Sequence, residues 1–448
     1  DRSEISSARN VLGKDISARA HVCKSIHLEA LGDSLITVTS IGPSTWPINV
    51  TEEITMSTLH RSLVTARRAA SKFLPDPAQY GWIRRMAGSG TDRVVPKEEV
   101  VRFVRECLCK AGTTAEDGQV VGHHLMTADY RGHFSHGMNR LQMYVQDIEM
   151  KVTDPAARPQ VLTDFQAIAL VDGSNGLGQV IGKFCMELAM EKAKKFGIGM
   201  VSARGSNHYG ICGYYTSMAI EQGLIGFSCT NTSPLMVPTR SKVVGLGTNP
   251  LSLGMGASGG DQFILDMATT AVALGKIELA LRKDEPIPPG WALGTDGQVT
   301  TDAEDAYAAS RLMPLGGEER NSGYKGYGLA LMVEVLCGVL SGAEFGPNVR
   351  QWKDKTKIAN LGQCFMAINP EAFGSGSKDR LSTLLKQLRS MPPAGDKPVL
   401  VAGDPERTAM ERVDKQGGIS YHPNQLKACE EFAEHMGVLP IKFVPKNA

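Results

Sequence analysis

Apolar residues recur at helical spacing along the segment that begins near Val94. Between Val100 and Ala111 they return every three or four positions, and Gly112 interrupts the repeat. Pro96 stands just ahead of this run, where its fixed φ suits the first turn of a helix. The pattern predicts a helix from Pro96 to Gly112.

Two more helices are predicted directly downstream. Thr113-Thr114-Ala115-Glu116 has the pattern of a capping box, and the apolar repeat that follows it ends by Gly132. A further helical repeat runs from Met138 to Met150. The stretch between these two helices therefore forms a loop and a helix N-terminus.

The pattern changes between about residues 160 and 300, where short apolar runs alternate with helical stretches. This alternation indicates an α/β layer. The predicted strands cover 168–173, 198–202, 224–230, 243–253 and 262–266, and the predicted helices cover 178–195 and 210–221. Beyond Gly328 the pattern predicts helices at 329–340, 378–389 and 424–436, and strands at 364–368 and 399–402.

Residues 1–93 differ from the rest because they lack sustained periodicity. We expect an extension that is disordered or serves targeting. Met56 to Arg85 is rich in basic residues and serine and holds one acid, Asp76, which is the composition of a mitochondrial transit peptide. The alternative is untranslated or mis-joined sequence with a true start at Met56 or Met86.

Composition narrows the class of protein. The net charge of +1 gives no reason to expect a nucleic-acid partner or an anionic membrane surface. The chain contains no run of about 18 apolar residues, so no transmembrane helix is predicted. The nine cysteines are scattered, which favours reduced thiols in an intracellular protein. We expect a cytoplasmic location, or the mitochondrial matrix if Met56–Arg85 is a transit peptide.

The densest candidate chemistry lies between Arg131 and Arg140. His136 is a suitable proton acceptor near neutral pH. Arg140 follows it by four residues, so on a helix both share one face, and its guanidinium suits a carboxylate. Alternatively, Arg140 is a surface residue. Ser135 either donates a hydrogen bond to a ligand or caps the helix.

Two other segments add titratable groups next to glycines. His208 lies in Ser206-Asn207-His208-Tyr209-Gly210, and Lys325 lies in Gly323-Tyr324-Lys325-Gly326-Tyr327-Gly328. Lys325 suits a phosphate or ribose, or is simply exposed at a helix start. Asp266 ends a predicted strand, where it orients a histidine, binds a ribose or caps a turn. We interpret these segments as one active site, with no metal.

Only Gly254-Met255-Gly256-Ala257-Ser258-Gly259 matches the dinucleotide fingerprint. A strand is predicted after it, whereas the fingerprint needs a helix N-terminus for the pyrophosphate. We therefore interpret it as a hairpin turn. Any dinucleotide would bind outside the usual Rossmann design.

Several motifs in order resemble the malate/L-lactate dehydrogenase family of type 2, also called sulfolactate dehydrogenase-like. The resemblance covers about residues 94–440. Its motifs are Ala128-Asp129-Tyr130-Arg131-Gly132-His133, Ser135-His136-Gly137, Asp172-Gly173-Ser174-Asn175-Gly176-Leu177-Gly178, Ser206-Asn207-His208-Tyr209-Gly210, Gly247-Thr248-Asn249-Pro250, Asp266-Met267-Ala268-Thr269, Pro314-Leu315-Gly316-Gly317 and Gly323-Tyr324-Lys325-Gly326-Tyr327-Gly328.

The resemblance implies NAD(P)-dependent oxidation of a 2-hydroxy acid, and oxidation of malate to oxaloacetate is the first choice. It also implies a homodimer. It implies an α/β fold of non-Rossmann type, with a discontinuous domain (94–160 plus 305–448) for substrate and dimerisation around a cofactor domain (161–304). His208 is implied as the proton acceptor, and Ser135, His136 and Arg140 as the substrate site. The implied cofactor contacts, to NAD or to NADP, are Thr232, Asp266, Met267, Ala268 and Lys325.

Other functions stay open at this point. One is a reductase of another 2-oxo acid or of a cyclic imine. A second is a non-catalytic relative that binds a nucleotide or a partner, although the expected polar groups are all present. A metal-dependent enzyme is a third, but no carboxylate or cysteine stands at ligand spacing from the histidines.

Overall fold

The computed structural model describes residues 25–31, 35–41, 51–55, 93–352 and 354–447. The chain divides into two compact units, Asp1–Gly81 and Trp82–Ala448. In the first unit an antiparallel sheet of order β1-β2-β3 is formed by β1 (Ser25–Leu31), β2 (Leu35–Ile41) and β3 (Thr51–Thr55). The sequence pattern predicts no strands there. The predicted transit segment, 56–85, lies outside the described residues.

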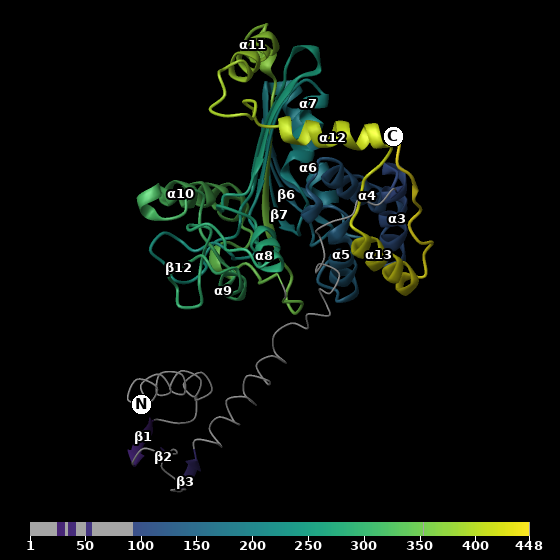
Figure 1. Cartoon of the computed structure of the whole chain (residues 1–448). Helices are drawn as coiled ribbons and strands as arrows, with labels where there is room; N and C mark the ends of the chain where they lie inside the picture. Colours follow the sequence, from purple (N-terminus) through teal and green to yellow (C-terminus); the bar gives the residue numbers. More distant parts are fainter. Residues whose placement is uncertain (1–24, 32–34, 42–50, 56–92, 353, 448) are drawn as a thin grey trace. The chain divides into compact units, whose positions relative to one another are not determined.

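The second unit is built on a mixed seven-stranded sheet (Figure 1). Its strand order is β10-β9-β8-β14-β7-β6-β5, and only β6 and β7 run parallel. The strands are β5 (Gln160–Phe165), β6 (Ile168–Asp172), β7 (Ile198–Ser206), β8 (Ile225–Thr230), β9 (Leu251–Gly256), β10 (Gln262–Met267) and β14 (Leu361–Ile368).

Strand β14 occupies the middle of this sheet although it comes from the C-terminal part of the chain. Its side chains alternate between two cores, as the period of two in a strand requires. Phe365 packs with Val201 and Tyr215 beneath the helices on one face, and Cys364 packs with Cys337 on the other. Both faces of β14 are therefore buried.

Helices cover both faces of the sheet (Figure 1). On one face lie α6 (Gly178–Phe196) and α7 (Cys212–Glu221), and on the other lies α10 (Gly323–Glu334), which continues as a π-helical turn, η6 (Val335–Val339). Beyond α6, a helical layer shares its own core. It consists of α3 (Lys97–Lys110), α4 (Ala115–Tyr130), α5 (Leu141–Glu149) and α13 (Pro423–Met436). No described helix is long and apolar enough to span a membrane.

Most predicted elements of the second unit are confirmed, with shifts at their ends. Thr114, rather than Thr113, caps α4, and its hydroxyl accepts a hydrogen bond from Asp117 N. The helix predicted from Met138 begins at Leu141, after two short 3₁₀ turns, Phe134–His136 and Met138–Arg140. The glycine motif at 254–259 lies in the β9–β10 hairpin, as predicted.

Three predictions were wrong. The strand expected from Val243 begins at Leu251, and the helix expected from Leu329 already begins at Gly323. The segment 399–402 is not a strand, because it gives the edge strand β10 one backbone hydrogen bond, from Ile264 N to Ala402 O, and then turns at Gly403. Helix α12 (Asp404–Gln416) follows and was not predicted.

The region around 270–315 also holds unpredicted elements. They are α8 (Leu274–Lys283), α9 (Ala303–Ala309) and a small sheet of β11 (Ala292–Leu293), β12 (Val299–Thr300) and β13 (Arg311–Leu312).

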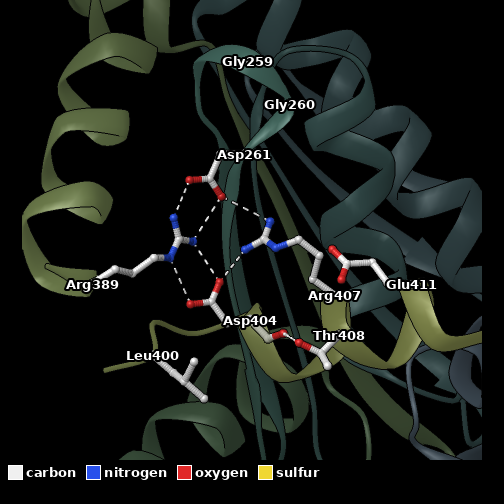
Figure 2. Close-up of a pocket in the computed structure, with 9 residues that line it drawn as sticks. All are labelled: Gly259, Gly260, Asp261, Arg389, Leu400, Asp404, Arg407, Thr408 and Glu411. Carbon is white, nitrogen blue, oxygen red and sulfur yellow. Dashed lines mark hydrogen bonds and ion pairs between the residues drawn. The ribbon is translucent and has the colours of Figure 1, made fainter. Parts of the chain in front are cut away.

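An ion-pair cluster fastens the C-terminal helices to the edge of the sheet (Figure 2). Arg389, at the end of α11 (Ser377–Arg389), binds Asp261 at 2.6 Å and Asp404 at 2.8 Å. Arg407 of α12 binds Asp404 at 2.6 Å and Asp261 at 3.2 Å. The pocket lined by these residues holds charges that neutralise one another, so it is a structural joint rather than a candidate ligand site.

Asp129 holds the loop that carries the first candidate cluster. Its side chain is fully buried at the end of α4, and Oδ2 accepts hydrogen bonds from Met138 N at 2.9 Å and from Tyr421 Oη at 2.7 Å. A Cβ on Gly137 would lie 1.8 Å from Asp129 Oδ1, so the chain needs glycine there. Burial raises the pKa of Asp129 to about 7, against the opposing effect of these two donors.

The substitution Asp129→Asn should remove one source of pH dependence from folding. Because the folded-state pKa is raised, the contribution of Asp129 to stability is largest below pH 4 and falls as pH rises to about 7. Asparagine keeps an acceptor for Met138 N and Tyr421 Oη and does not ionise. We expect its melting temperature to fall less than that of the wild type between pH 4 and 7.

Asp129→Ala is the matched comparison. It leaves two buried donors unpaired and opens a cavity, so we expect a loss of about 2–4 kcal/mol at every pH. Thermal unfolding followed by circular dichroism at several pH values measures both variants. Equal losses in the two variants at pH 7.5 would contradict this account, since they would show that the negative charge itself is needed.

Candidate active site

One face of α5 carries three polar side chains that lie at the candidate site. Arg140, Tyr144 and Asp147 are spaced by four and three residues, which places them on one side of the helix. Arg140 precedes the helix and donates from Nε to Ser135 O at 2.5 Å. The three side chains therefore face the site from a single rigid element.

His208 lies opposite this face, in the loop between β7 and α7. Its Nδ1 shares a hydrogen bond of 2.7 Å with Tyr144 Oη, and Gly210 N makes a longer contact of 3.4 Å with the same atom. The indole of Trp352 packs edge to face on the imidazole, with ring centroids 5.1 Å apart. Among the described residues, Nε2 has no protein partner.

His136 joins His208 as predicted. The two imidazoles stack at 5.7 Å between centroids, and His136 Nδ1 shares a hydrogen bond of 2.9 Å with Ser135 Oγ. Burial lowers the pKa of His136 to about 3 and that of His208 well below its ordinary value, and the charge of Arg140 adds to both effects. Both rings are therefore neutral near pH 7 and are able to accept a proton.

The loop of His208 is fixed by close backbone contacts. Ile211 N donates to Nε2 of the buried His124 at 2.9 Å, so the proton of that ring lies on Nδ1. A Cβ on Gly178, in the first turn of α6, would lie 2.5 Å from His208 O. Gln363 of β14 donates to Asn207 O at 3.0 Å. Three elements thus hold the loop on three sides.

A second titratable cluster lies beside the same loops. Asp266 accepts a hydrogen bond of 2.7 Å from Gly213 N, in the first turn of α7, and burial raises the pKa of its carboxyl group. The charges of His133 and Arg131 act in the opposite direction. His133 Nε2 is 3.6 Å from Glu406 of α12, and the buried Arg131 Nε has no hydrogen-bond partner in the described structure.

Hydrogen bonds through Thr248 connect Thr232 with Thr269, the residue that follows the predicted cofactor residues Met267 and Ala268. Thr248 N donates to Thr232 Oγ1, and Thr269 N donates to Thr248 O, both at 2.9 Å. Thr269 directly follows the half-buried Met267 and Ala268. Its carbonyl accepts from Leu315 N, and Leu315 lies against Gly326 at the start of α10.

Lys325 has the second of the two settings that its sequence allowed, an exposed position at a helix start. The glycine-rich segment 323–328 is the first half of α10, and Lys325 is exposed in the first turn of that helix. The structure therefore assembles the histidines, Arg140 and Asp266 around two neighbouring loops. Thr232 and the start of α10 are linked to this group through the hydrogen bonds of Thr248, Thr269 and Leu315.

Sequence reasoning missed two residues that border the histidine pair. Tyr144 was counted among the apolar positions of its helix, and its partner His208 is 64 residues away. Trp352 lies in a loop with basic residues on both sides and has no local signal. The spacing of Arg140 and Tyr144 on one helix face was the available clue to the first. In the described part of the chain, no three His, Cys, Asp or Glu side chains gather in a way that would hold a metal ion.

Comparison with known proteins identifies the family of this chain. The family described as malate/L-lactate dehydrogenase matches residues 95–429. The chain is 41% identical over 348 residues to malate dehydrogenase of Pyrococcus abyssi, covering 77% of this chain and 95% of that relative. It is 36% identical over 348 residues to L-sulfolactate dehydrogenase of Methanocaldococcus jannaschii, covering 77% and 98%.

The fold also matches a solved structure. Malate dehydrogenase of Pyrococcus horikoshii superposes with a TM-score of 0.71 at 37% identity, covering 79% of this chain and 99% of that one. The family match spans well over half of the chain and includes both histidine loops and Asp266. This protein belongs to the malate/L-lactate dehydrogenase family.

Proposed function

We propose that this protein oxidises a 2-hydroxy acid to the 2-oxo acid with a nicotinamide cofactor, and that malate, which gives oxaloacetate, is the preferred substrate. The observation that carries the proposal is the placement of a neutral histidine, His208, beside the cation Arg140 in a largely desolvated site. Relatives named malate dehydrogenase at 41% and 39% identity support malate as the substrate.

His208 accepts the hydroxyl proton in this mechanism. The mechanism uses the tautomer with the proton on Nδ1, which donates to Tyr144 Oη at 2.7 Å instead of accepting from Gly210 N at 3.4 Å and leaves the Nε2 lone pair for the substrate. Burial raises the pKa of Tyr144, so its hydroxyl stays neutral and keeps the ring oriented. A bound nicotinamide cofactor supplies the acceptor for the hydride that leaves C2.

Arg140 binds the substrate carboxylate and thereby changes the basicity of His208. In the free enzyme its positive charge lowers the pKa of His208, after burial itself and together with His136. A carboxylate paired with Arg140 cancels that charge, so the imidazole becomes a stronger base once the substrate has bound. Ser135 and His136 complete the polar side of the site.

The cofactor site runs from Asp266 towards the start of α10. The observation that fits it is the unpartnered, buried Arg131 Nε beside Asp266, a donor and an acceptor suited to a hydroxylated anionic ligand. The other proposed cofactor contacts are Thr232, Met267, Ala268 and Lys325. We infer NAD rather than NADP, because the carboxylate of Asp266 suits a ribose hydroxyl and repels a 2′-phosphate.

The same evidence supports a cofactor site outside the Rossmann design. The only dinucleotide-like glycine motif lies in a hairpin, with β10 after it instead of a helix. We propose that 161–304 forms the cofactor side and that 94–160 with 305–448 forms the substrate side. The central position of β14 means that the two parts share one sheet.

A cytoplasmic location is the simplest proposal, with the mitochondrial matrix as the alternative if Met56–Arg85 is a transit peptide. The described cysteines support a reducing compartment, since all eight are free thiols. Cys229 and Cys337 lie only 3.5 Å apart between their Sγ atoms and are still unbonded.

We also propose that α10 pairs with a second copy of this chain. Its outer face is apolar at helical spacing, with Tyr324, Leu331, Val335 and Val339 each at least 40% exposed. The charged residue on that face is Lys325, at the end of the row. An exposed apolar row of this length is typical of a protein interface, and a homodimer buries it by self-association.

The first test of the function is a substrate panel. Purified protein with NAD or NADP, and malate, lactate, sulfolactate or other 2-hydroxy acids, is followed by the nicotinamide absorbance band. We expect the highest kcat/KM with malate and NAD. A cofactor that binds without turnover of any acid would instead indicate a non-catalytic nucleotide-binding relative.

His208→Ala should lower kcat about 100- to 10,000-fold, because general-base catalysis contributes that much. Cofactor binding, measured by fluorescence titration, should stay within about two-fold in this variant. Because the pKa of His208 is lowered, we expect kcat/KM for oxidation in the wild type to stay flat from pH 8 to below pH 6.5. The control His435→Ala removes an exposed histidine of α13 and should leave turnover unchanged. Near-normal turnover in His208→Ala would rule out its role as base.

The dimer is tested by light scattering after size exclusion. Val335→Asp combined with Val339→Asp should shift the measured mass from two chains to one, because two charges in the C-terminal half of the apolar row oppose its burial. Phe373→Asp is the matched control, since Phe373 is 81% exposed at a different site. A wild-type mass of a single chain would contradict the proposal.

A further inference from the structure

The loop at 350–357 brings Trp352 against both groups of the proposed chemistry. Its indole packs edge to face on His208 at 5.1 Å, with an interplanar angle of 85°. Arg140 Cζ lies 5.2 Å from the centroid of the same ring, within range of a cation–π contact. Trp352 therefore borders the proposed base and the proposed carboxylate clamp at once.

Asp147 of α5 anchors this loop on both sides of Trp352. Its Oδ2 binds Arg350 Nη2 at 3.0 Å, and its Oδ1 binds Lys355 Nζ. The side chains of Asp147 and Arg350 are 9% and 8% exposed, so this pair is shielded from water and from salt. Arg350 Nη1 also donates to Asp354 O and Lys357 O at 3.0 Å, which closes the loop on itself.

The anchor and the site share one helix. Asp147 is three residues beyond Tyr144 and seven beyond Arg140, so the helix sets their spacing. The same helix thus holds the clamp, the partner of the base and the anchor of the Trp352 loop. The position of the indole relative to Arg140 and His208 is therefore fixed rather than left to a free loop.

We propose that Trp352 is a specificity-determining residue that limits the size of the substrate side chain, and that Asp147 is a positioning residue that holds it. The inference rests on the proposed function. A 2-hydroxy acid has its hydroxyl at His208 and its carboxylate at Arg140, and it gives up the hydrogen on C2. The side chain is the remaining group on C2, and the indole borders both anchor points.

The first experiment compares Trp352→Ala and Trp352→Phe with the wild type. kcat and KM are measured with lactate, malate and 2-hydroxy acids that carry branched and aromatic side chains. We expect Trp352→Ala to raise the kcat/KM ratio of the largest acid to malate by about 10-fold or more, with Trp352→Phe in between. Trp291→Phe is the control for loss of a tryptophan elsewhere and should leave the ratio unchanged. An unchanged ratio in Trp352→Ala overturns the inference.

The second experiment tests Asp147 through Trp352. Asp147→Asn keeps the shape of the side chain and removes its charge from Arg350 and Lys355. We expect the substrate ratio to shift in the same direction as in Trp352→Ala. The double variant should shift it no further than Trp352→Ala alone, because both changes remove one device. Additive shifts would show that Asp147 acts on the site independently and would overturn its positioning role.

A binding measurement separates failure of this inference from failure of the proposed function. Malate and oxaloacetate are titrated against tryptophan fluorescence in the wild type and in Trp352→Phe, with cofactor present. We expect quenching in the wild type that is lost in Trp352→Phe and kept in Trp291→Phe. If no acid is oxidised, the proposed function fails. Quenching that does not depend on Trp352 overturns the inference whether or not turnover occurs.

Discussion

The insertion of β14 between β7 and β8 is the constraint on which the rest of the second unit depends. Its backbone pairs with both neighbours along most of its length, and its two faces belong to different cores. Its side chains and backbone also reach the loops: Gln363 donates to Asn207 O, and Gly362 N donates to Asn231 Oδ1. A Cβ on Gly362 would lie 2.4 Å from the carbonyl group of Cys337, so glycine permits the close approach of the π-helical turn. The central strand of the sheet therefore also helps to set the position of the His208 loop.

This packing removes water from several polar groups. Two of the buried carboxylates are hydrogen-bonded to neutral donors instead. Glu334 of α10 is 4% exposed, and burial raises its pKa. Its two oxygens accept hydrogen bonds from the amides of Asn231 and Asn249 at 3.0 and 3.1 Å. Asp129 is held in the same way by a backbone amide and a tyrosine. Glu334 and Asp129 are thus held by neutral donors and need no compensating cation, whereas Asp147 is paired with Arg350 and Lys355.

Local sequence patterns predicted the elements whose apolar faces meet a core. The helices α3, α4 and α6 and the strands β6 and β8 are of this kind, since each repeats apolar residues at its own period. Helix α12 escaped prediction because its buried apolar residues are few, Ala409 and Val413, and the ion pairs of Arg407 with two aspartates that also hold it leave no periodic signal. Glycine-flanked histidines were enough to place His136 beside His208. Tyr144 and Trp352 were not predicted, because what makes them part of the site is a partner at a distance in the chain rather than a neighbour.

The candidate site is divided between two structural supports, helix α5 and strand β10. Arg140 directly precedes α5, which carries Tyr144 and Asp147, so the distances among the proposed clamp, the partner of the proposed base and the anchor of the Trp352 loop follow the helical rise. Asp266 and the proposed cofactor residues lie on β10 and in other segments, which form a separate support. The two meet at loops fixed by Asp129 and by His124, whose burial lowers its pKa to about 3 and keeps it a neutral acceptor for Ile211 N.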